Sequence, residues 1–175
     1  MATRPAEEGL AVHLVAMRRR HLRAVLRIEA QVYPRPWTLG LFLSELSLRP
    51  SRVYLVAKVG GTVVGFAGLM ITVDEGHVTT IAVDPAWQRR GIGARLLVAL
   101  ARAAIARGCR GLTLEVRMSN EPAQAMYRRF GFAPAGVRKG YYPETGEDAL
   151  VMWVHDVHLP DYQSRLSAIE AGLSW

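Results

Sequence analysis

Two glycines separated by one residue, Gly91 and Gly93, follow a β-type run that ends at Asp84-Pro85 and precede a long helix with apolar periodicity. A strand, a glycine-bearing turn and a helix N-terminus together form an anion site, because free backbone N–H groups and the helix dipole converge on a phosphate. Glycine lets the backbone approach that phosphate without a Cβ in the way. The segment therefore predicts a pyrophosphate-binding turn and a nucleotide-like cofactor.

This turn differs from two better-known phosphate motifs. It is not a P-loop, because no Gly-Lys-Ser or Gly-Lys-Thr follows it, and Leu96 stands where a dinucleotide fingerprint has its third glycine. A glycine-bearing turn between strand and helix also occurs without any ligand, so other residues must support the interpretation. The neighbouring Arg89 and Arg90 favour a phosphate.

The elements around the turn predict an α/β fold. Apolar alternation and apolar runs predict strands at about 12–17, 53–59, 63–72, 77–83, 112–116, 133–141 and 148–155. Apolar periodicity and capping residues predict helices at about 20–31, 38–48, 92–107 and 120–130. In the third helix, Arg95 and Arg102 are expected off the apolar face. This order implies a mixed central β-sheet of about seven strands with helices on both faces.

Length and composition fit one globular domain. The chain has 175 residues, half of them apolar, which is enough to bury a core. We expect a disordered N-terminus at 1–11, a folded domain at 12–155 and a C-terminal extension at 156–175. In the extension, four apolar residues recur at helical spacing: Tyr162, Leu166, Ile169 and Leu173.

Charge and cysteine usage limit the partners. The net charge is +7, but the arginines stand in short groups without interleaved aromatics, so we interpret them as solvated surface and expect no direct nucleic-acid role. A single cysteine, Cys109, excludes an internal disulfide and predicts a reducing compartment. The five histidines, His77 among them, show no metal-ligand spacing and are assigned no role. No membrane span or signal peptide is recognisable, so a cytoplasmic protein without a metal is expected.

The chain resembles the GNAT superfamily of N-acetyltransferases over about residues 12–155, and within it the RimI group of bacterial ribosomal-protein-alanine N-acetyltransferases. The Gln88-Arg89-Arg90-Gly91-Ile92-Gly93 turn is similar to the acetyl-CoA signature of the superfamily. Further matching segments follow the family order: Pro36-Trp37-Thr38; Ile81-Ala82-Val83-Asp84-Pro85; Leu114-Glu115-Val116-Arg117 with Ser119-Asn120; Ala125-Met126-Tyr127 with Phe130-Gly131-Phe132; and Tyr141-Tyr142-Pro143 with Glu147-Asp148-Ala149. Each segment alone is weak, and their order over one domain is specific.

The resemblance implies acetyl-CoA as co-substrate and assigns residues to it. The strand before the glycines would splay from its neighbour, so that the backbone of Ile81, Ala82 and Val83 pairs with the pantetheine arm. The pyrophosphate would be held by Arg89, Arg90, Gly91, Ile92, Gly93 and Ala94. Asn120 would contact the cofactor as well, although it also suits a helix cap.

The resemblance also implies that Glu115 is the general base, acting through a water, and that Tyr127 protonates the CoA thiolate. A base is needed because an N-terminal amine, with a pKa of roughly 8, is mostly protonated at pH 7. Glu115 ends an apolar strand, where partial burial is expected to raise its pKa toward neutrality; the alternative is a surface glutamate. Proton transfer from a phenol to a thiolate is uphill by roughly 2 kcal/mol. Tyr127, by periodicity a core aromatic, is therefore expected to donate the proton or to stabilise the thiolate.

The expected substrate is the N-terminus of a ribosomal protein or a similar peptide, attacking directly in a ternary complex. Direct attack needs no enzyme nucleophile, so Cys109 is expected to be a small core residue. Two aromatic clusters are candidates for the walls of a peptide groove, with ordinary loop packing as the alternative: Tyr33, Trp37, Tyr141 and Tyr142.

Other functions remain open on the sequence alone. The alternative is a GNAT enzyme for a lysine side chain or a small-molecule amine. A small amine such as a drug or polyamine would favour an acidic pocket, and the obvious candidate carboxylates are few: Asp74, Glu75 and Glu144. An inactive acetyl-CoA sensor or a nucleic-acid-binding module is a further alternative. The presence of both Glu115 and Tyr127 argues against inactivity.

Overall fold

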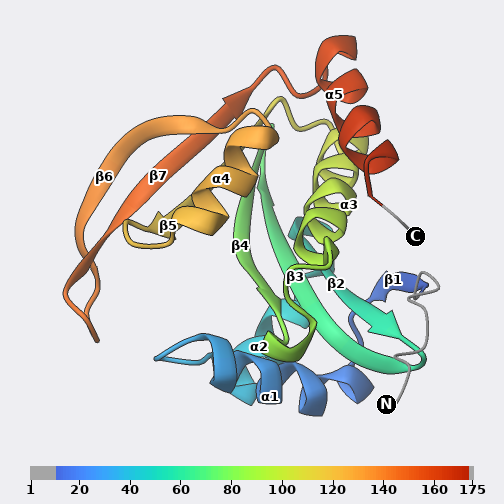
Figure 1. The fold of residues 1–175 in the computed structure, drawn as a ribbon, viewed down its shortest axis with the longest axis vertical. Helices are drawn as coiled ribbons and strands as arrows, with labels where there is room; N and C mark the ends of the chain where they lie inside the picture. Colours follow the sequence, from blue (N-terminus) through green and yellow to red (C-terminus); the bar gives the residue numbers. More distant parts are fainter. Residues whose placement is uncertain (1–10, 174–175) are drawn as a thin grey trace, which may run out of the picture.

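A seven-stranded sheet forms the centre of the molecule in a computed structural model that describes residues 11–173 (Figure 1). The strand order is β1-β2-β3-β4-β5-β7-β6, and only β4 and β5 pair in parallel. The strands are β1 Val12–Ala16, β2 Arg52–Val59, β3 Thr62–Thr72, β4 Glu75–Val83, β5 Gly111–Arg117, β6 Ala133–Tyr142 and β7 Glu147–His155. The predicted mixed sheet is confirmed. The predicted disordered N-terminus lies, apart from Ala11, outside the described residues.

Helices cover both faces of the sheet, as expected (Figure 1). On one face lie α1 Leu22–Val32 and α2 Leu39–Ser47; on the other lie α3 Ile92–Ala106, α4 Glu121–Arg129 and α5 Pro160–Ala171. Three 3-10 turns join these elements, at Arg19–His21, Arg49–Ser51 and Pro85–Trp87. Thr38 caps α2 as predicted, since its hydroxyl accepts a 3.2 Å hydrogen bond from the N–H of Leu41.

The C-terminal helix α5 packs against the core. Tyr162, Leu166 and Ile169 are buried in the same cluster as the apolar face of α3. Leu173, just beyond α5, lies beside the turn that begins α3, close to Gly91 and Arg95. Helical spacing in the extension thus corresponds to a helix that covers one side of α3.

Arg95 is buried although it lies off the sheet-facing stripe of α3, as predicted. It is only 3% exposed, and the sequence gives no sign of this burial. Its guanidinium Nη1 donates a 3.1 Å hydrogen bond to the carbonyl of Arg90, and Leu14 and Leu173 lie around it. A helical wheel identifies the face toward the sheet but not a second face covered by α5. Arg102 is exposed, as predicted, and lies 3.5 Å from Glu170.

The sheet opens between β4 and β5. These strands pair only at their beginning, where Glu75, Gly76 and His77 oppose Gly111, Leu112 and Thr113. Beyond that point the two strands diverge, and β5, β7 and β6 fan away from the N-terminal half of the sheet (Figure 1). The pairing of β4 with β5 therefore stops at His77, whereas β4 stays paired with β3 as far as Val83, next to the glycine-bearing turn.

A β-bulge lies in β4 beside this opening. Leu69 pairs with Val78 and Gly68 with Thr80, so Thr79 is an extra residue in β4. Val78 packs against the apolar core on the α3 face of the sheet, whereas Ala82 packs on the opposite face, under α1 and α2. The two residues are four apart, so without the bulge they would lie on the same face. The bulge thus redirects the side chains of β4 where the site begins.

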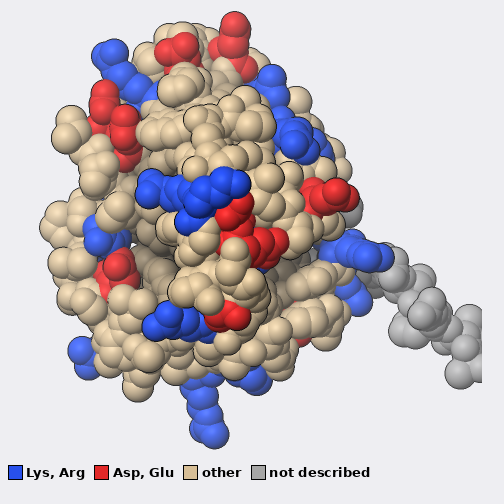
Figure 2. Space-filling model, turned by 90° about the vertical axis from the view of Figure 1, so that its left-hand side faces the viewer, with Lys and Arg blue, Asp and Glu red and all other residues tan. Residues whose placement is uncertain are grey.

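Charges of both signs share the surface near the β6–β7 hairpin. Figure 2 shows acidic and basic side chains interspersed on this face of the molecule, with no single-sign field. Arg117 and Lys139 pair there with Glu144, Glu147 and Asp148. This face does not present the continuous cationic stripe that a nucleic-acid backbone favours.

Candidate active site

The edge of β4 that faces the opening carries backbone groups directed away from β3. The hydroxyl of Tyr33 donates a 2.6 Å hydrogen bond to the carbonyl of Ile81, whereas the N–H of Asp84 bonds to Val64 in β3. Successive residues of a strand direct their N–H and C=O groups toward opposite edges. The N–H groups of Ile81 and Val83 therefore point into the opening. Ala82 directs its backbone toward β3. The structure thus offers an extended ligand a strand edge at Ile81 and Val83.

The glycine-bearing turn ends at the N-terminus of α3. Gly91 is the N-cap with φ +77° and makes no side-chain capping bond. A Cβ at Gly91 would lie 3.1 Å from Leu173 and 3.4 Å from Arg95, so only glycine fits without displacement. The first N–H groups of α3, at Ile92, Gly93 and Ala94, have no intrahelical acceptor. This is the backbone geometry that an anion-binding turn requires, and the pyrophosphate site itself stays a prediction.

The two arginines of the turn lie outside the helix. Arg89 adopts φ +64° and is exposed, and the exposed guanidinium of Arg90 lies 4.9 Å from the centre of the Trp87 ring. Gln88 donates a 3.1 Å hydrogen bond to the carbonyl of Val83 and thereby ties the turn to β4. Both guanidinium groups can add positive charge to the turn.

Tyr127 and Asn120 belong to α4 and its cap, on the far side of the opening from β4. Asn120 caps the helix, because its Oδ1 accepts a 3.2 Å hydrogen bond from the N–H of Ala123. Tyr127 is 5% exposed. Burial raises its pKa well above the ordinary value, and the nearby Tyr33 and Tyr142 add to that rise. A phenol with a raised pKa gives up its proton less readily, which favours stabilisation of a thiolate over simple donation.

Glu115 does not have the pKa that the sequence predicts. Its Oε2 lies 2.6 Å from Nε2 of His77, and its Oε1 lies 3.4 Å from Nε of Arg138. The hydrogen bond from His77 lowers the pKa of the carboxyl, burial opposes this, and the charges of His77 and Arg138 lower it further. The expectation of a raised pKa is wrong, because it rests on burial without these two partners.

His77 was missed by sequence reasoning. It is the last residue of β4 that pairs with β5, and its partner there is Thr113. Thr113 lies two residues before Glu115 in the same strand. Side chains two apart share a face of a strand, so His77 and Glu115 meet on the same side of the sheet. A β-alternation argument could have placed His77 on this face, but the register with β5 could not be read from the sequence.

The candidate substrate aromatics divide into two groups. Tyr33 and Tyr142 lie near Tyr127, and burial is the main cause of their raised pKa values. Tyr141 is exposed and meets Tyr142 edge-on, with ring centres 5.1 Å apart. Trp37 instead packs against Phe42 at 5.2 Å, in the cluster beneath α1 and α2. The two predicted clusters therefore meet through Tyr33 and Tyr142.

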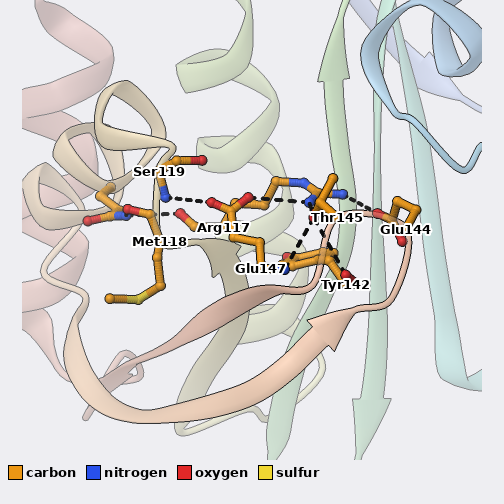
Figure 3. A network of polar contacts seen from close by, with 8 residues as sticks. Arg117, Met118, Ser119, Tyr142, Glu144, Thr145 and Glu147 are labelled. Atoms are coloured by element: carbon orange, nitrogen blue, oxygen red, sulfur yellow. Dashed lines mark hydrogen bonds and ion pairs between the residues drawn. The ribbon is translucent and has the colours of Figure 1, made fainter.

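Arg117 holds the hairpin that carries these tyrosines. Its guanidinium lies 3.8 Å from the ring centre of Tyr142 and pairs with Glu144 and, at 3.3 Å, with Glu147 (Figure 3). It also donates a 3.0 Å hydrogen bond to Thr145. The carboxylate of Glu147 in turn accepts from the N–H of Ser119, at the start of α4. The sequence marks Arg117 only as a member of a matching segment.

A second buried carboxyl lies under the loop between α1 and α2. Glu29 is 1% exposed; its Oε1 accepts a 3.2 Å hydrogen bond from the N–H of Trp37, and its Oε2 is buried without a hydrogen-bond partner among the described residues. Burial raises its pKa to about 7. The sequence places Glu29 only on a helix face and does not reveal this burial.

The acidic residues weighed for a small-amine pocket do not form one. Asp74 and Glu75 lie at the beginning of β4, where the strands are still together. Glu144 is engaged by Arg117. Glu115, the carboxylate that borders the opening, is already paired with His77 and Arg138.

Three further kinds of site concern the described part of the chain: a metal site, a membrane-spanning helix and a reactive thiol. Residues 11–173 contain no group of three or more His, Cys, Asp or Glu side chains placed to hold a metal ion. None of their helices is both long and apolar enough to cross a membrane. Cys109 is fully buried, and burial raises its pKa, which confirms the expected small core residue.

Known proteins share both the sequence pattern and the fold of this chain. The model of the acetyltransferase (GNAT) family matches residues 22–132. The chain is 41% identical over 148 residues to the N-alpha-acetyltransferase RimI of Mycobacterium tuberculosis, covering 81% of this chain and 90% of that protein. It is 38% identical over 133 residues to the ribosomal protein bS18-alanine N-acetyltransferase of Escherichia coli, covering 75% and 88%. A crystal structure of that Escherichia coli enzyme superimposes with a TM-score of 0.77 at 34% identity, covering 83% of this chain and 94% of that one.

Proposed function

The chain belongs to the acetyltransferase (GNAT) family, and we propose that it acetylates the N-terminal alanine of a small-subunit ribosomal protein, using acetyl-CoA. It is an N-acetyltransferase, as its relatives are named. The finer assignment draws on the relative from Escherichia coli, whose name specifies a ribosomal-protein alanine. We infer direct attack of the amine on the thioester in a ternary complex.

One observation carries the proposal: two separate sets of groups border the opening between β4 and β5, and we assign one to the cofactor and the other to the peptide. The glycine-bearing turn and the free edge of β4 form the first. Glu115, Tyr33 and Tyr142 form the second, with Tyr127 close to both tyrosines. An amine and a thioester approaching from opposite sides meet within one opening, which is the proximity that a ternary mechanism needs.

Acetyl-CoA fits the residues of the cofactor side. The first turn of α3 and Gly91 leave N–H groups free for a pyrophosphate, and Arg89 and Arg90 can supply charge. The edge of β4 at Ile81 and Val83 suits an extended amide-bearing arm. When bound, the thioester supplies an activated acetyl group. We assign one of these N–H groups to polarisation of its carbonyl.

Glu115 and Tyr127 divide the proton chemistry. We assign removal of the ammonium proton to the site around Glu115, which leaves a neutral amine as the nucleophile. Tyr127 lies across the opening, and its raised pKa suits a hydrogen bond to the departing thiolate sulfur. Asn120 serves first as the α4 cap and so holds Tyr127 in place.

The peptide side suits an extended chain end rather than a small cation. Tyr33 and Tyr142 come from opposite ends of the chain and flank the opening, and Tyr141 is exposed beside them. Trp37 packs against Phe42 and so supports the loop between α1 and α2. Glu144 is paired with Arg117, so it is not free to attract a polyamine or a cationic drug.

The experiment is steady-state release of CoA thiol from acetyl-CoA with alanine-starting ribosomal peptides and their N-terminally blocked copies. Turnover that vanishes on blocking supports N-terminal acetylation. Persistent turnover moves the target to a lysine side chain, and turnover with small amines alone would indicate a small-molecule enzyme. Acetyl-CoA binding without turnover on any amine would refute the proposal.

A further inference from the structure

His77 and Glu115 form a hydrogen-bonded pair between β4 and β5. The ring nitrogen Nε2 of His77 lies 2.6 Å from Oε2 of Glu115, and the side chains of the pair are 26% and 11% exposed. An ionised carboxylate only accepts hydrogen bonds, so a neutral His77 must carry its proton on Nε2 and leave a lone pair on Nδ1. The pair thus has the arrangement of a carboxylate that orients an imidazole base.

Glu115 alone is poorly suited to take the proton. The contacts with His77 and Arg138 favour its ionised form and lower its pKa. A carboxylate of ordinary pKa, about 4.3, is already more than three units below an N-terminal ammonium, which costs roughly 5 kcal/mol for proton transfer. An imidazole in water, with a pKa of about 6.5, reduces that cost to about 2 kcal/mol.

We propose that His77 is the proton acceptor of the reaction and that Glu115 orients its ring and stabilises the imidazolium. This rests on the proposed function, because it names the group that receives the proton of the amine. One N–H bond of the substrate ammonium breaks, and its proton passes to Nδ1 of His77. The amine nitrogen then forms the bond to the acetyl carbon, and the C–S bond breaks with its electron pair on the sulfur. The second proton that the nitrogen loses passes to this thiolate, so the products are the neutral amide and CoA thiol. The imidazolium returns its proton to solvent.

The surroundings of the pair favour this role. From β6, Arg138 lies 3.4 Å from the other oxygen of Glu115. Tyr141 lies nearby, and its pKa is raised mainly by burial and further by the charge of Glu115. From β7, the residues opposite Glu115 and Thr113 are Val151 and Trp153. From β3, Met70 faces His77. Neither β7 nor β3 adds a charge at these positions. On β4 itself, the exposed Glu75 shares the face of His77, and Glu115 is the carboxylate within hydrogen-bond distance of the ring.

The variant His77→Gln distinguishes a residue that accepts the proton from one that only donates a hydrogen bond to Glu115. Glutamine keeps an N–H donor for Glu115 but cannot take up a proton at neutral pH. We expect kcat/KM for an alanine-starting peptide to fall by about 10²-fold at pH 7. The loss should shrink to within about threefold at about pH 9.5, where the amine deprotonates itself. His13→Gln is the matched control, because His13 is exposed on β1, and it should be unchanged at both values.

Two results would overturn the proposal. Near wild-type activity of His77→Gln at pH 7 would mean that donation to Glu115 is all that His77 provides, and an equal loss at both pH values would mean a structural defect. Circular dichroism and the thermal midpoint check folding. Nitrogen-15 NMR of the His77 ring gives a readout without turnover, with the proton expected on Nε2; a proton on Nδ1 would contradict the mechanism.

The outcome is separable from the proposed function. If the wild-type protein acetylates only a lysine side chain or a small amine, the proposed peptide substrate is wrong. The His77→Gln comparison is then run with that amine, and the pH dependence still decides the role of His77. A double variant with Glu115→Gln should be no slower than the slower single variant, because the two residues act as one unit.

Discussion

The hydroxyl of Tyr33 and the carbonyl of Ile81 are joined by a 2.6 Å hydrogen bond across 48 residues of sequence. Tyr33 ends α1 on the peptide side, and Ile81 lies on the strand edge assigned to the cofactor. Because the carbonyl is held from one side, the N–H of the same residue keeps its direction into the opening. The bond thus couples the loop that borders the peptide to the edge that borders acetyl-CoA.

Replacing Tyr33 by phenylalanine tests this coupling. The ring stays while one hydrogen bond is lost, at a cost of about 1 kcal/mol. We expect KM for peptide to rise about fivefold and the affinity for acetyl-CoA to weaken in the same direction. Steady-state kinetics and calorimetry with acetyl-CoA measure both. Tyr162→Phe is the control, because Tyr162 lies in α5 and its hydroxyl has no hydrogen-bond partner among the described residues. A change in neither quantity would show that the bond is only structural.

Glu115→Gln is expected to lose about 10²-fold in kcat/KM at pH 7 and to regain much of it near pH 9.5. The carboxylate is ionised at neutral pH, because its pKa is lowered by His77 and Arg138. Its loss removes the partner of the imidazolium, whereas a substrate that is already neutral needs no base. Rates across this pH range with saturating acetyl-CoA provide the measurement. A loss independent of pH would assign Glu115 a purely positioning role.

Glu29 should make the folded protein less stable as the pH rises through the range below neutrality. Its pKa is raised to about 7 by burial, whereas the unfolded chain has an ordinary value near 4.3. Between these values the folded state binds more protons, so the free energy of unfolding falls as the pH rises, in total by about 4 kcal/mol.

Glu29→Gln removes this titration but keeps an oxygen for the N–H of Trp37. We expect the variant to lose less stability than the wild-type protein between pH 5 and pH 8, by about 3 kcal/mol. Urea unfolding at the two pH values gives the comparison, with Glu75→Gln, an exposed carboxyl, as control. Identical slopes in variant and wild type would mean that Glu29 titrates normally.

Gly91→Ala is expected to weaken acetyl-CoA binding about tenfold. The residue adopts φ +77° at the start of α3, and a Cβ there would lie 3.1 Å from Leu173. Forcing an L-residue into this conformation costs about 1–2 kcal/mol and displaces the first N–H groups of the helix. Isothermal titration with acetyl-CoA measures the effect. Gly108→Ala is a useful control, because Gly108 also has positive φ but follows the other end of α3. Equal affinity of wild type and Gly91→Ala would remove this turn from the cofactor site.

Local signals account for what could be predicted along the chain. Gly91 and Gly93 mark the turn, Thr38 and Asn120 mark helix starts, and strand periodicity marks the seven strands, because each signal depends on neighbours within about one helical turn. The family motifs add order to these elements. Glu115, Tyr127 and Tyr33 can therefore be named from the amino-acid sequence alone.

Tertiary packing determines the contacts, the burial and the protonation of these residues. The meeting of His77 with Glu115 depends on the register of two parallel strands and joins residues 38 apart in the chain, and no local pattern encodes that register. The burial of Glu29 and Arg95 depends on the loop after α1 and on the segment at the end of α5, which cover faces that periodicity leaves exposed. The elements and the reactive groups of this protein follow from its sequence, because both depend on residue type and short-range order. Their partners, and through those partners their protonation, follow from the tertiary fold, because only the fold brings distant segments into contact.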